Sequence, residues 1–318
     1  MENTTQVTTF VFSGLTDNEK LLPFLFIFFL FIYLLTIMSN IGIIALVCNT
    51  SRLHSPMYYF LSYLSLVDIF YSSVITPKMF SDLILGRKVI SFNGCALQFF
   101  FYAALGGTET FLLSAMSYDR YIAVCHPLHY MSVMTKMKCL WMAIFSFSAG
   151  FFQSAVQTSC AFSLKFCGSN LIDHFYCDIP PVLKLSCSHT FHCTIVTICM
   201  VSLCTISSLM AILLSYLFIL ASVLRMKSTE SRKKAFSTCS SHFMCASVFY
   251  VTVFFTYLRP PSSVFTGQDK VAAIFYSTVT PMLNPLAYTL RNQEVKRIIA
   301  QLVVNFKSTD TGFSNHHM

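Results

Sequence analysis

Long apolar runs alternate along the chain with short segments that carry most of its charge. A helix needs about 20 apolar residues to cross the ~30 Å hydrocarbon core of a bilayer. Seven runs reach that length, so the pattern predicts an all-α membrane protein with a seven-transmembrane helix bundle. The predicted spans are residues 21–47, 56–80, 95–120, 139–160, 190–224, 235–258 and 271–290.

The chain divides into three parts around this bundle. Residues 1–20 form a polar N-terminal segment, residues 21–290 form the bundle, and residues 291–318 form a tail. The N-terminal segment lacks the basic start and short apolar core of a cleaved signal peptide, so we expect the first span to act as an uncleaved signal. Early in the tail, apolar residues alternate with Lys296 and Arg297, which is typical of a short amphipathic helix at a membrane interface.

Composition and charge agree with a membrane protein. Hydrophobic residues make up 55% of the chain, charged residues make up 11%, and the mean hydropathy is +0.65. The formal net charge is +8, but most Lys and Arg residues fall in alternate loops on one side of the membrane, as expected of cytoplasmic loops. The charge therefore predicts an extracellular N-terminus and a cytoplasmic tail, with no nucleic-acid partner. On the outer side, Asn3 begins an Asn-Thr-Thr acceptor for glycosylation.

The third span ends in a charged motif. Residues 116–128 read Met-Ser-Tyr-Asp-Arg-Tyr-Ile-Ala-Val-Cys-His-Pro-Leu, and Asp119 and Arg120 lie where the span meets water. A lone charge at a helix end is often only a snorkelling anchor. Asp-Arg-Tyr at this place, however, resembles the rhodopsin-like G-protein-coupled receptors, and the flanking residues resemble their odorant-receptor branch.

Further motifs extend the resemblance to class II (tetrapod-type) odorant receptors over essentially the whole chain. They are Leu-His-Ser-Pro-Met-Tyr-Tyr-Phe-Leu at 53–61, Ser-Tyr at 215–216, Lys-Ala-Phe-Ser-Thr-Cys-Ser-Ser-His at 234–242, and Pro-Met-Leu-Asn-Pro-Leu-Ala-Tyr-Thr-Leu-Arg-Asn at 281–292. The chain departs from the family's usual residues at Ser39, Ser117, Val251, Ala287 and Thr289.

The resemblance implies an odorant receptor in the plasma membrane, in contact with membrane lipid, in the cilia of sensory neurons. Such a receptor binds a small-molecule odorant and activates a heterotrimeric stimulatory G protein of the olfactory type, which raises cyclic AMP. The same receptor type sensing a metabolite outside the olfactory epithelium is an open alternative. A membrane transporter or channel would need repeated halves, broken helices or a charged pathway, and only Asp68 and Glu109 offer part of one. The sequence contains neither a nucleophile–base–acid set nor a phosphate-binding loop, so no motif indicates an enzyme.

The resemblance places the ligand cavity between the third, fifth, sixth and seventh helices. In the third helix, Ala103, Gly106 and Gly107 leave room for a ligand. By motif position, the residues that face them are Met200, Cys204, Tyr250, Val253, Tyr257, Ile274 and Ser277. Each is equally well explained as helix packing, but the set describes an apolar pocket that suits small, weakly polar organic molecules. The third helix offers no acid near its outer end for an amine, and Lys270 lies too far out for a retinal Schiff base.

The resemblance also implies a set of activation residues, namely Asp119, Arg120, Tyr216, Asn284 and Tyr288. Asp119 holds Arg120 in the resting state and releases it on activation, when the two tyrosines hydrogen-bond within the opened bundle. The basic residues Lys233 and Lys234 would then meet the G protein, although membrane orientation alone also explains their charge.

Helix arithmetic, at ~1.5 Å per residue, places Asn40, Asp68, Glu109 and Asn284 at similar depths in the membrane. One interpretation is a hydrogen-bonded layer that only joins helices. The other interpretation is a cation or proton site. Two neighbouring carboxylates cannot both stay charged unless a cation lies between them, and otherwise one of them takes up a proton. The resemblance points to sodium at Asp68, near Glu109, and implies no other cofactor.

Four cysteines lie on the predicted outer side, where paired cysteines are oxidised, namely Cys95, Cys167, Cys177 and Cys187. Spacing alone allows three pairings. The resemblance selects Cys95–Cys177 and Cys167–Cys187. Cys160 and Cys193 lie near helix ends and could form a further bridge, but we expect free thiols there.

A metal site is the rival interpretation of the same outer loop. His174, Cys177 and Asp178 lie close together in sequence, and His189 or His192 would supply a further ligand. A disulfide at Cys177 would remove the thiolate that such a site needs.

Overall fold

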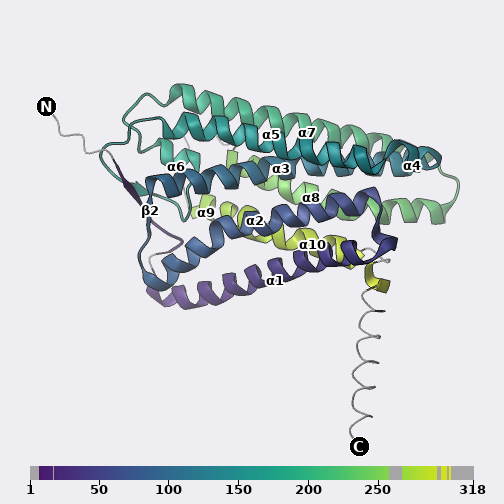
Figure 1. The fold of residues 1–318 in the computed structure, drawn as a ribbon, viewed down its shortest axis with the longest axis horizontal. Helices are drawn as coiled ribbons and strands as arrows, with labels where there is room; N and C mark the ends of the chain where they lie inside the picture. The colour runs from purple at the N-terminus through teal and green to yellow at the C-terminus, as the bar shows by residue number, and fades with distance from the viewer. Residues whose placement is uncertain (1–6, 17, 258–266, 292–294, 299–300, 302–318) are drawn as a thin grey trace, which may run out of the picture.

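The computed structural model describes residues 7–16, 18–257, 267–291, 295–298 and 301. Within these residues, seven long helical rods lie side by side (Figure 1). Six of them are α1 (Leu22–Asn49), α2 (Pro56–Leu85), α3 (Phe92–Cys125), α5 (Lys136–Phe162), α7 (Phe191–Arg225) and α8 (Thr229–Tyr257). The seventh consists of α9 (Gly267–Ile274), the π-helix η4 (Phe275–Val279) and α10 (Thr280–Arg291).

The surface of the rods is the surface of a membrane protein. In the described part of the chain, α1, α2, α3, α5 and α7 are each long and apolar enough to cross a bilayer. Large apolar side chains such as Phe24, Phe152 and Leu217 point outward and are exposed, which only a lipid environment tolerates over so wide an area. With α8 and the seventh rod, these helices form the predicted seven-helix bundle, so the predicted fold class is confirmed.

Most helices extend beyond the predicted spans. α2 continues from the predicted end at residue 80 to Leu85, where Gly86 adopts φ +64° and its N–H bonds to the Asp82 carbonyl. α3 begins at Phe92 because the Ser91 hydroxyl caps it by accepting from the Gly94 N–H at 3.1 Å. Its 34 residues correspond to ~51 Å, far more than the ~30 Å apolar core. Apolar runs mark only the part inside lipid, whereas capping residues set the helix ends.

A small sheet lies at one end of the bundle, here called the sheet end (Figure 1). It contains β1 (Thr9–Phe12), β2 (Val89–Ser91) and β3 (Leu171–Ile172), in the order β2-β1-β3. β1 is antiparallel to β2 and parallel to β3. The polar composition of residues 1–20 predicts no such strand, but Phe10 and Phe12 point inward and are fully buried.

Short helical segments fill the connections. They are η1 (Glu19–Leu21), η2 (Ser51–Leu53), η3 (Pro127–His129), α4 (Tyr130–Val133) and α6 (Ile179–Leu183). In the tail, residues 295–298 form a helical turn in which Val295 and Ile298 are buried and Lys296 and Arg297 are exposed. This turn has the amphipathic pattern that the sequence predicts.

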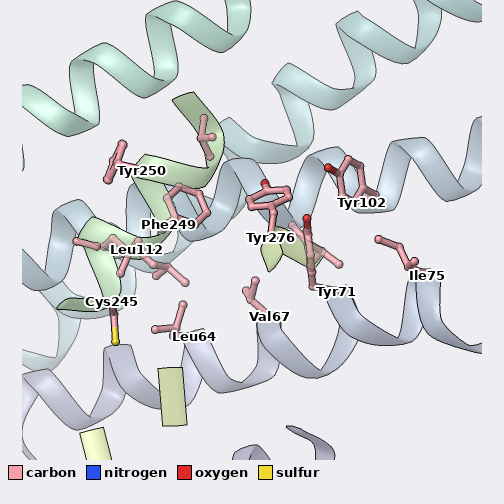
Figure 2. Packing of buried hydrophobic residues seen from close by; sticks show 14 of the residues in the cluster. Leu64, Val67, Tyr71, Ile75, Tyr102, Leu112, Cys245, Phe249, Tyr250 and Tyr276 are labelled. Carbon is pink, nitrogen blue, oxygen red and sulfur yellow. The ribbon is translucent and has the colours of Figure 1, made fainter. Parts of the chain in front are cut away.

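α3 runs through the middle of the bundle, between α1 on one side and α5 and α7 on the other (Figure 1). Around it, aromatic and aliphatic side chains from several rods form one core (Figure 2). Tyr71 of α2 packs against Tyr102 of α3 and Tyr276 of η4, with ring centroids 5.3 and 5.6 Å away. This aromatic cluster forms one side of the cavity described next.

Candidate functional site

A cavity of about 50 Å³ lies in the half of the bundle nearer the sheet, between α3, α5, α7, α8 and η4. Its wall is aromatic and aliphatic with a few hydroxyl and amide groups, and no described lining residue is an acid, a base or a histidine. The lining residues are Phe99, Tyr102, Ala103, Gly106, Gly107, Thr110, Gln153, Gln157, Ile179, Thr197, Val201, Cys204, Thr205, Phe249, Val253 and Tyr276.

Half of the predicted ligand-binding set lines this cavity, namely Ala103, Gly106, Gly107, Cys204 and Val253. Gly106 leaves space that Tyr276 fills, because a Cβ at Gly106 would stand 2.6 Å from the Tyr276 hydroxyl. The third helix therefore contributes small residues where the sequence predicts them.

Four other predicted residues do not line the cavity, and these are Met200, Tyr250, Ile274 and Ser277. Tyr250 turns toward α7, where its hydroxyl lies 2.6 Å from the Ser208 hydroxyl. In the seventh rod, the π-helical winding of η4 changes the rotational phase, and Tyr276 reaches the cavity instead of its neighbours. The side chain of Tyr257 lies outside the described residues.

The predicted set omits α5, the fourth span, which supplies Gln153 and Gln157 to the wall. Thr197 of α7 lies on the same wall and is also absent from the prediction. The sequence contains an indication of this wall, because two glutamines four residues apart lie on one helix face and amides are costly in an apolar span.

A loop covers the cavity at the sheet end and is held there by a disulfide between Cys95 and Cys177, with Cα atoms 5.5 Å apart. The Cys177 N–H donates to Gln98 Oε1 at 3.0 Å. Next to this bond, the Tyr176 hydroxyl lies 3.1 Å from that of Tyr102, a cavity residue. The disulfide thus fixes the cover of the cavity.

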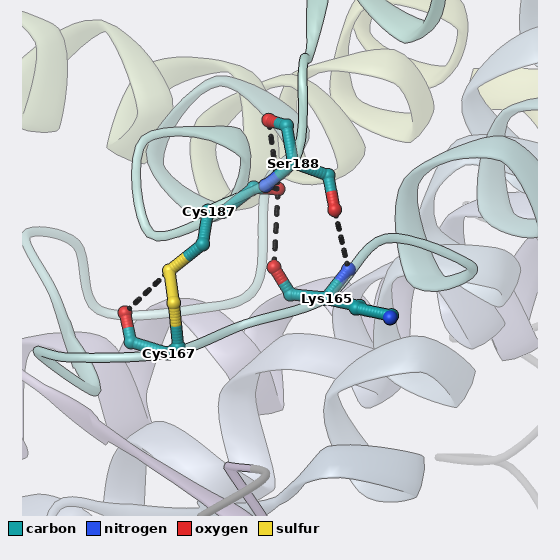
Figure 3. The surroundings of a disulfide bond; sticks show 5 residues. Lys165, Cys167, Cys187 and Ser188 are labelled. Carbon is teal, nitrogen blue, oxygen red and sulfur yellow. Dashed lines mark hydrogen bonds between the residues drawn. A yellow bond between two sulfur atoms is a disulfide. The ribbon is translucent and has the colours of Figure 1, made fainter. Parts of the chain in front are cut away.

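The structure also contains a disulfide between Cys167 and Cys187 (Figure 3). Backbone and side-chain bonds between Lys165 and the segment at Cys187 and Ser188 hold the two strands of the loop together. With Cys177 in a disulfide, the predicted metal interpretation of this loop has no thiolate ligand.

The prediction of free thiols at Cys160 and Cys193 is wrong. The two residues form a disulfide, with Cα atoms 5.6 Å apart. They lie near the sheet-end termini of α5 and α7, which the fold brings together. Sequence spacing contains no information on that approach.

A polar cluster ties the seventh rod to the sheet. Lys270 Nζ lies 2.9 Å from both Asp173 Oδ1 and Ser13 Oγ and donates to the Gly14 carbonyl at 3.1 Å. Hydrogen bonds from Lys270 and Ser13 hold the pKa of Asp173 below its ordinary value. Burial lowers the pKa of the neighbouring His174 to about 3, so this imidazole is neutral at physiological pH. Lys270 therefore holds the sheet end of the bundle together and does not line the cavity.

Near the middle of the bundle, Asn284 bridges two buried carboxylates. Its Nδ2 lies 3.2 Å from both Asp68 carboxylate oxygens and 3.0 Å from Glu109 Oε1. Asn40 is separate from this cluster and donates instead to the Pro281 carbonyl at 3.1 Å. The arrangement brings together three of the four residues that helix arithmetic places at one depth.

At the end of the bundle opposite the sheet, Arg120 pairs with its neighbour Asp119. Arg120 Nη2 and Nε lie 2.5 and 3.1 Å from Asp119 Oδ2, and the pair is buried. The Tyr130 hydroxyl donates to Asp119 Oδ1 at 2.8 Å. Burial, followed by the Asp119 charge, raises the pKa of this phenol, so the hydroxyl remains a donor. Both carboxylate oxygens of Asp119 therefore accept hydrogen bonds.

About two turns nearer the centre along α3, His242 joins three helices and was absent from the predicted set. Its Nε2 lies 3.0 Å from the Leu113 carbonyl of α3, and its Nδ1 lies 2.7 Å from the Tyr216 hydroxyl of α7. A carbonyl only accepts, so Nε2 carries the proton. His242 ends the motif at 234–242, which is the sequence feature that indicates it. The side chain of Tyr288 falls outside the described part of the chain.

Comparisons with known proteins identify the family. A family model described as "Olfactory receptor" matches residues 29–306. Olfactory receptor 5B12 of Homo sapiens is 50% identical over 97% of this chain and 98% of its own length. Olfactory receptor 5B21 of Mus musculus is 48% identical over 96% of each chain.

A solved structure supports the fold independently. Squid rhodopsin matches with a TM-score of 0.72, covering 90% of this chain and 81% of its own, at 18% identity. That identity is too low to indicate more than a shared architecture. Given the family model and the near-full-length relatives, the chain belongs to the olfactory receptor family.

Proposed function

We propose that this protein is an odorant receptor that binds small, weakly polar organic molecules and activates a stimulatory, olfactory-type G protein to raise cyclic AMP. The observation that carries the proposal is the buried, uncharged cavity between α3, α5, α7, α8 and η4 in a chain of this family. A receptor of the same type that senses a metabolite would use the same cavity.

Activation in this proposal is a shift between two packings of the bundle. A ligand shifts that equilibrium only by binding one packing more tightly than the other. Because the cavity wall includes Tyr276 of the seventh rod and Val253 of α8, a bound ligand contacts the helices that must move. In the described packing, the His242 contacts connect α8 with α3 and α7, and the Tyr130 hydrogen bond to Asp119 connects α4 with α3. Opening of the bundle would break the His242 contacts and release Arg120 from Asp119.

The proposed orientation places the sheet end outside the cell and the Arg120 end in the cytoplasm. The basic segment at Lys233 and Lys234 would then meet the G protein, and the proposed site is the plasma membrane of sensory cilia. Glycosylation of Asn3 belongs to the same orientation, although that residue lies outside the described ranges.

We also propose that Asp68 and Glu109 hold a sodium ion. Their carboxylates reach the same Asn284 amide nitrogen, and in the part of the chain that the structure describes neither forms an ion pair with a basic residue. Two buried carboxylates without a cationic partner fit a monovalent cation, or a proton, that neutralises them. A sodium ion would supply positive charge, while Asn284 orients the two carboxylates.

Asp68→Asn is expected to abolish the effect of sodium on activation. In the intact receptor, exchanging sodium for a large organic cation should change the ligand concentration for half-maximal response by about fivefold or more, because a bound ion favours one packing. The variant should show a ratio near one. Asp82→Asn, on the same helix but paired with Lys78, is the matched control and should respond like the intact chain. An unchanged sodium effect in Asp68→Asn would remove Asp68 from the site.

The coupling proposal is tested by cyclic AMP in transfected cells exposed to a panel of volatile organic molecules. The panel is run in cells with and without the stimulatory Gα subunits. A ligand-evoked rise that requires those subunits supports the proposal. A rise that persists without them contradicts the proposed coupling.

A further inference from the structure

The cavity wall contains three buried polar atoms without a hydrogen-bond partner in the described part of the chain. They are Gln153 Oε1, Gln157 Nε2 and Thr197 Oγ1. These residues are 8%, 2% and 9% exposed. Buried polar atoms are almost always paired, so three orphaned atoms on one cavity wall indicate that their partner is a molecule in the cavity.

The three atoms come from adjoining places. Gln153 and Gln157 lie one turn apart on the same face of α5, and Thr197 faces the cavity from α7. Gln153 Oε1 lies 3.1 Å from the place that a Cβ on Gly107 would occupy, so this oxygen packs directly against the glycine in the wall of the cavity.

The atoms require a specific combination of hydrogen bonds. Gln153 Oε1 only accepts and so needs a donor, whereas Gln157 Nε2 only donates and so needs an acceptor. Thr197 Oγ1 does both. A ketone, aldehyde, ester or ether accepts only, and it would leave the Gln153 oxygen unpaired. A hydroxyl group donates one hydrogen bond and accepts others, so it satisfies both amides.

The uncharged character of the described cavity wall also restricts which functional groups the ligand can carry. No acid, base or histidine is among the described lining residues, so an ammonium or a carboxylate would be buried without a counter-ion. The rest of the wall, including Phe99, Phe249 and Val253, suits an apolar body. The ligand is therefore neutral, mainly apolar and hydroxylated.

We propose that Gln153, Gln157 and Thr197 form a hydroxyl-recognition site and that the preferred ligands of this receptor are small neutral alcohols. This inference rests on the proposed function, because it concerns the same cavity. The competing account is that water molecules fill the cavity and satisfy the three atoms without any preference among organic ligands.

The test compares short-chain primary alcohols, from butanol to octanol, with the methyl ether and methyl ketone that have the same number of non-hydrogen atoms. Binding is measured on the purified full-length receptor in lipid nanodiscs, as the ligand-dependent rise in its unfolding temperature. Signalling is measured as cyclic AMP in transfected cells. At least one alcohol is expected to act at a concentration about tenfold below its ether and ketone, because these leave a buried acceptor unpaired.

Gln153→Leu should remove this preference, because the acceptor for the donated hydrogen bond is lost. The alcohol should weaken about tenfold, to the level of the ether, while the ether keeps its potency. Gln157→Leu should weaken the alcohol, the ether and the ketone alike, because each accepts a hydrogen bond from Gln157 Nε2, and the preference for alcohols should remain. Both variants should fold, since leucine replaces an unpaired buried amide and breaks no hydrogen bond within the described residues. Thr158→Val is the matched control, because its hydroxyl is also buried and unpaired on α5 but does not line the cavity. This control should keep the full preference for alcohols.

The outcomes separate this inference from the proposed function. Equal potency of alcohols, ethers and ketones on the intact receptor would overturn the inference and favour a water-filled cavity, even if cyclic AMP rises. Absence of any alcohol binding would also overturn it. A preference for alcohols that survives in Gln153→Leu would assign it to other residues and overturn the site. Selective alcohol binding in nanodiscs without cyclic AMP would support the site and contradict the proposed coupling.

Discussion

Gly150→Ala is expected to keep most of the receptor from reaching the cell surface. A Cβ at this position would stand 2.5 Å from both the Ala104 carbonyl oxygen and the Thr108 amide nitrogen of α3. These are backbone atoms, so no side-chain rotation relieves the clash and α5 must move away from α3. Overpacking of this kind typically costs about 1–3 kcal/mol, a large share of the ~5–15 kcal/mol that stabilises a typical protein.

Gly42→Ala is the matched control for this change. Gly42 also lies inside a long helix, but a Cβ there would meet no atom within 4 Å. The substitution should leave surface expression unchanged, or raise stability slightly, because alanine favours a helix over glycine by up to about 1 kcal/mol. The readouts are surface immunostaining and the unfolding temperature of the purified receptor. Equal values for the two variants would show that α3 and α5 do not pack as described.

The membrane-spanning segments are predictable from the sequence, because the length of an apolar run directly reflects the thickness of the bilayer. Counting residues along regular helices also predicts that Asp68, Glu109 and Asn284 lie at similar depths, but not that they meet, because the same count includes Asn40, which lies apart. Asp119 and Arg120 are sequence neighbours, so their pairing requires only a helix end.

The cavity wall depends on how each helix is rotated, and a single sequence does not reveal that rotation. The π-helical segment η4 turns Tyr276, and not Ile274 or Ser277, toward the cavity. Gln153 and Gln157 reach the cavity because glycines at 107 and 150 let α5 pack closely against α3. Such effects depend on packing between helices and leave little trace in the pattern of apolar residues.

Contacts between elements that lie far apart in the sequence could not be predicted either. The Cys160–Cys193 disulfide depends on the meeting of two helix ends, and β1 is only four residues long, too short for a reliable period. His242 bonds to α3 and α7 at once, although its position in the motif at 234–242 indicated only the sixth helix. In each case the partner lies on another element, which the local sequence does not identify.

Arg120→Ala is expected to abolish the ligand-evoked response while the receptor still reaches the surface. In the described packing, the buried guanidinium is bound by Asp119, and the proposed activation frees its five donors for the G protein. Alanine offers no such donors. Tyr130 still donates to Asp119 in the variant, which limits the cost of leaving that carboxylate without its arginine.

The most direct test of the account is cyclic AMP in cells that express the intact chain, Arg120→Ala or the exposed control Arg52→Ala at matched surface levels. Each is challenged with the organic panel, including the alcohols. If Arg120 is the switch, the intact chain and Arg52→Ala should give a concentration-dependent rise, and Arg120→Ala should respond no more than cells without receptor. Equal ligand-evoked responses from the intact chain and Arg120→Ala would contradict the proposed activation, because Arg120 would then not be the switch.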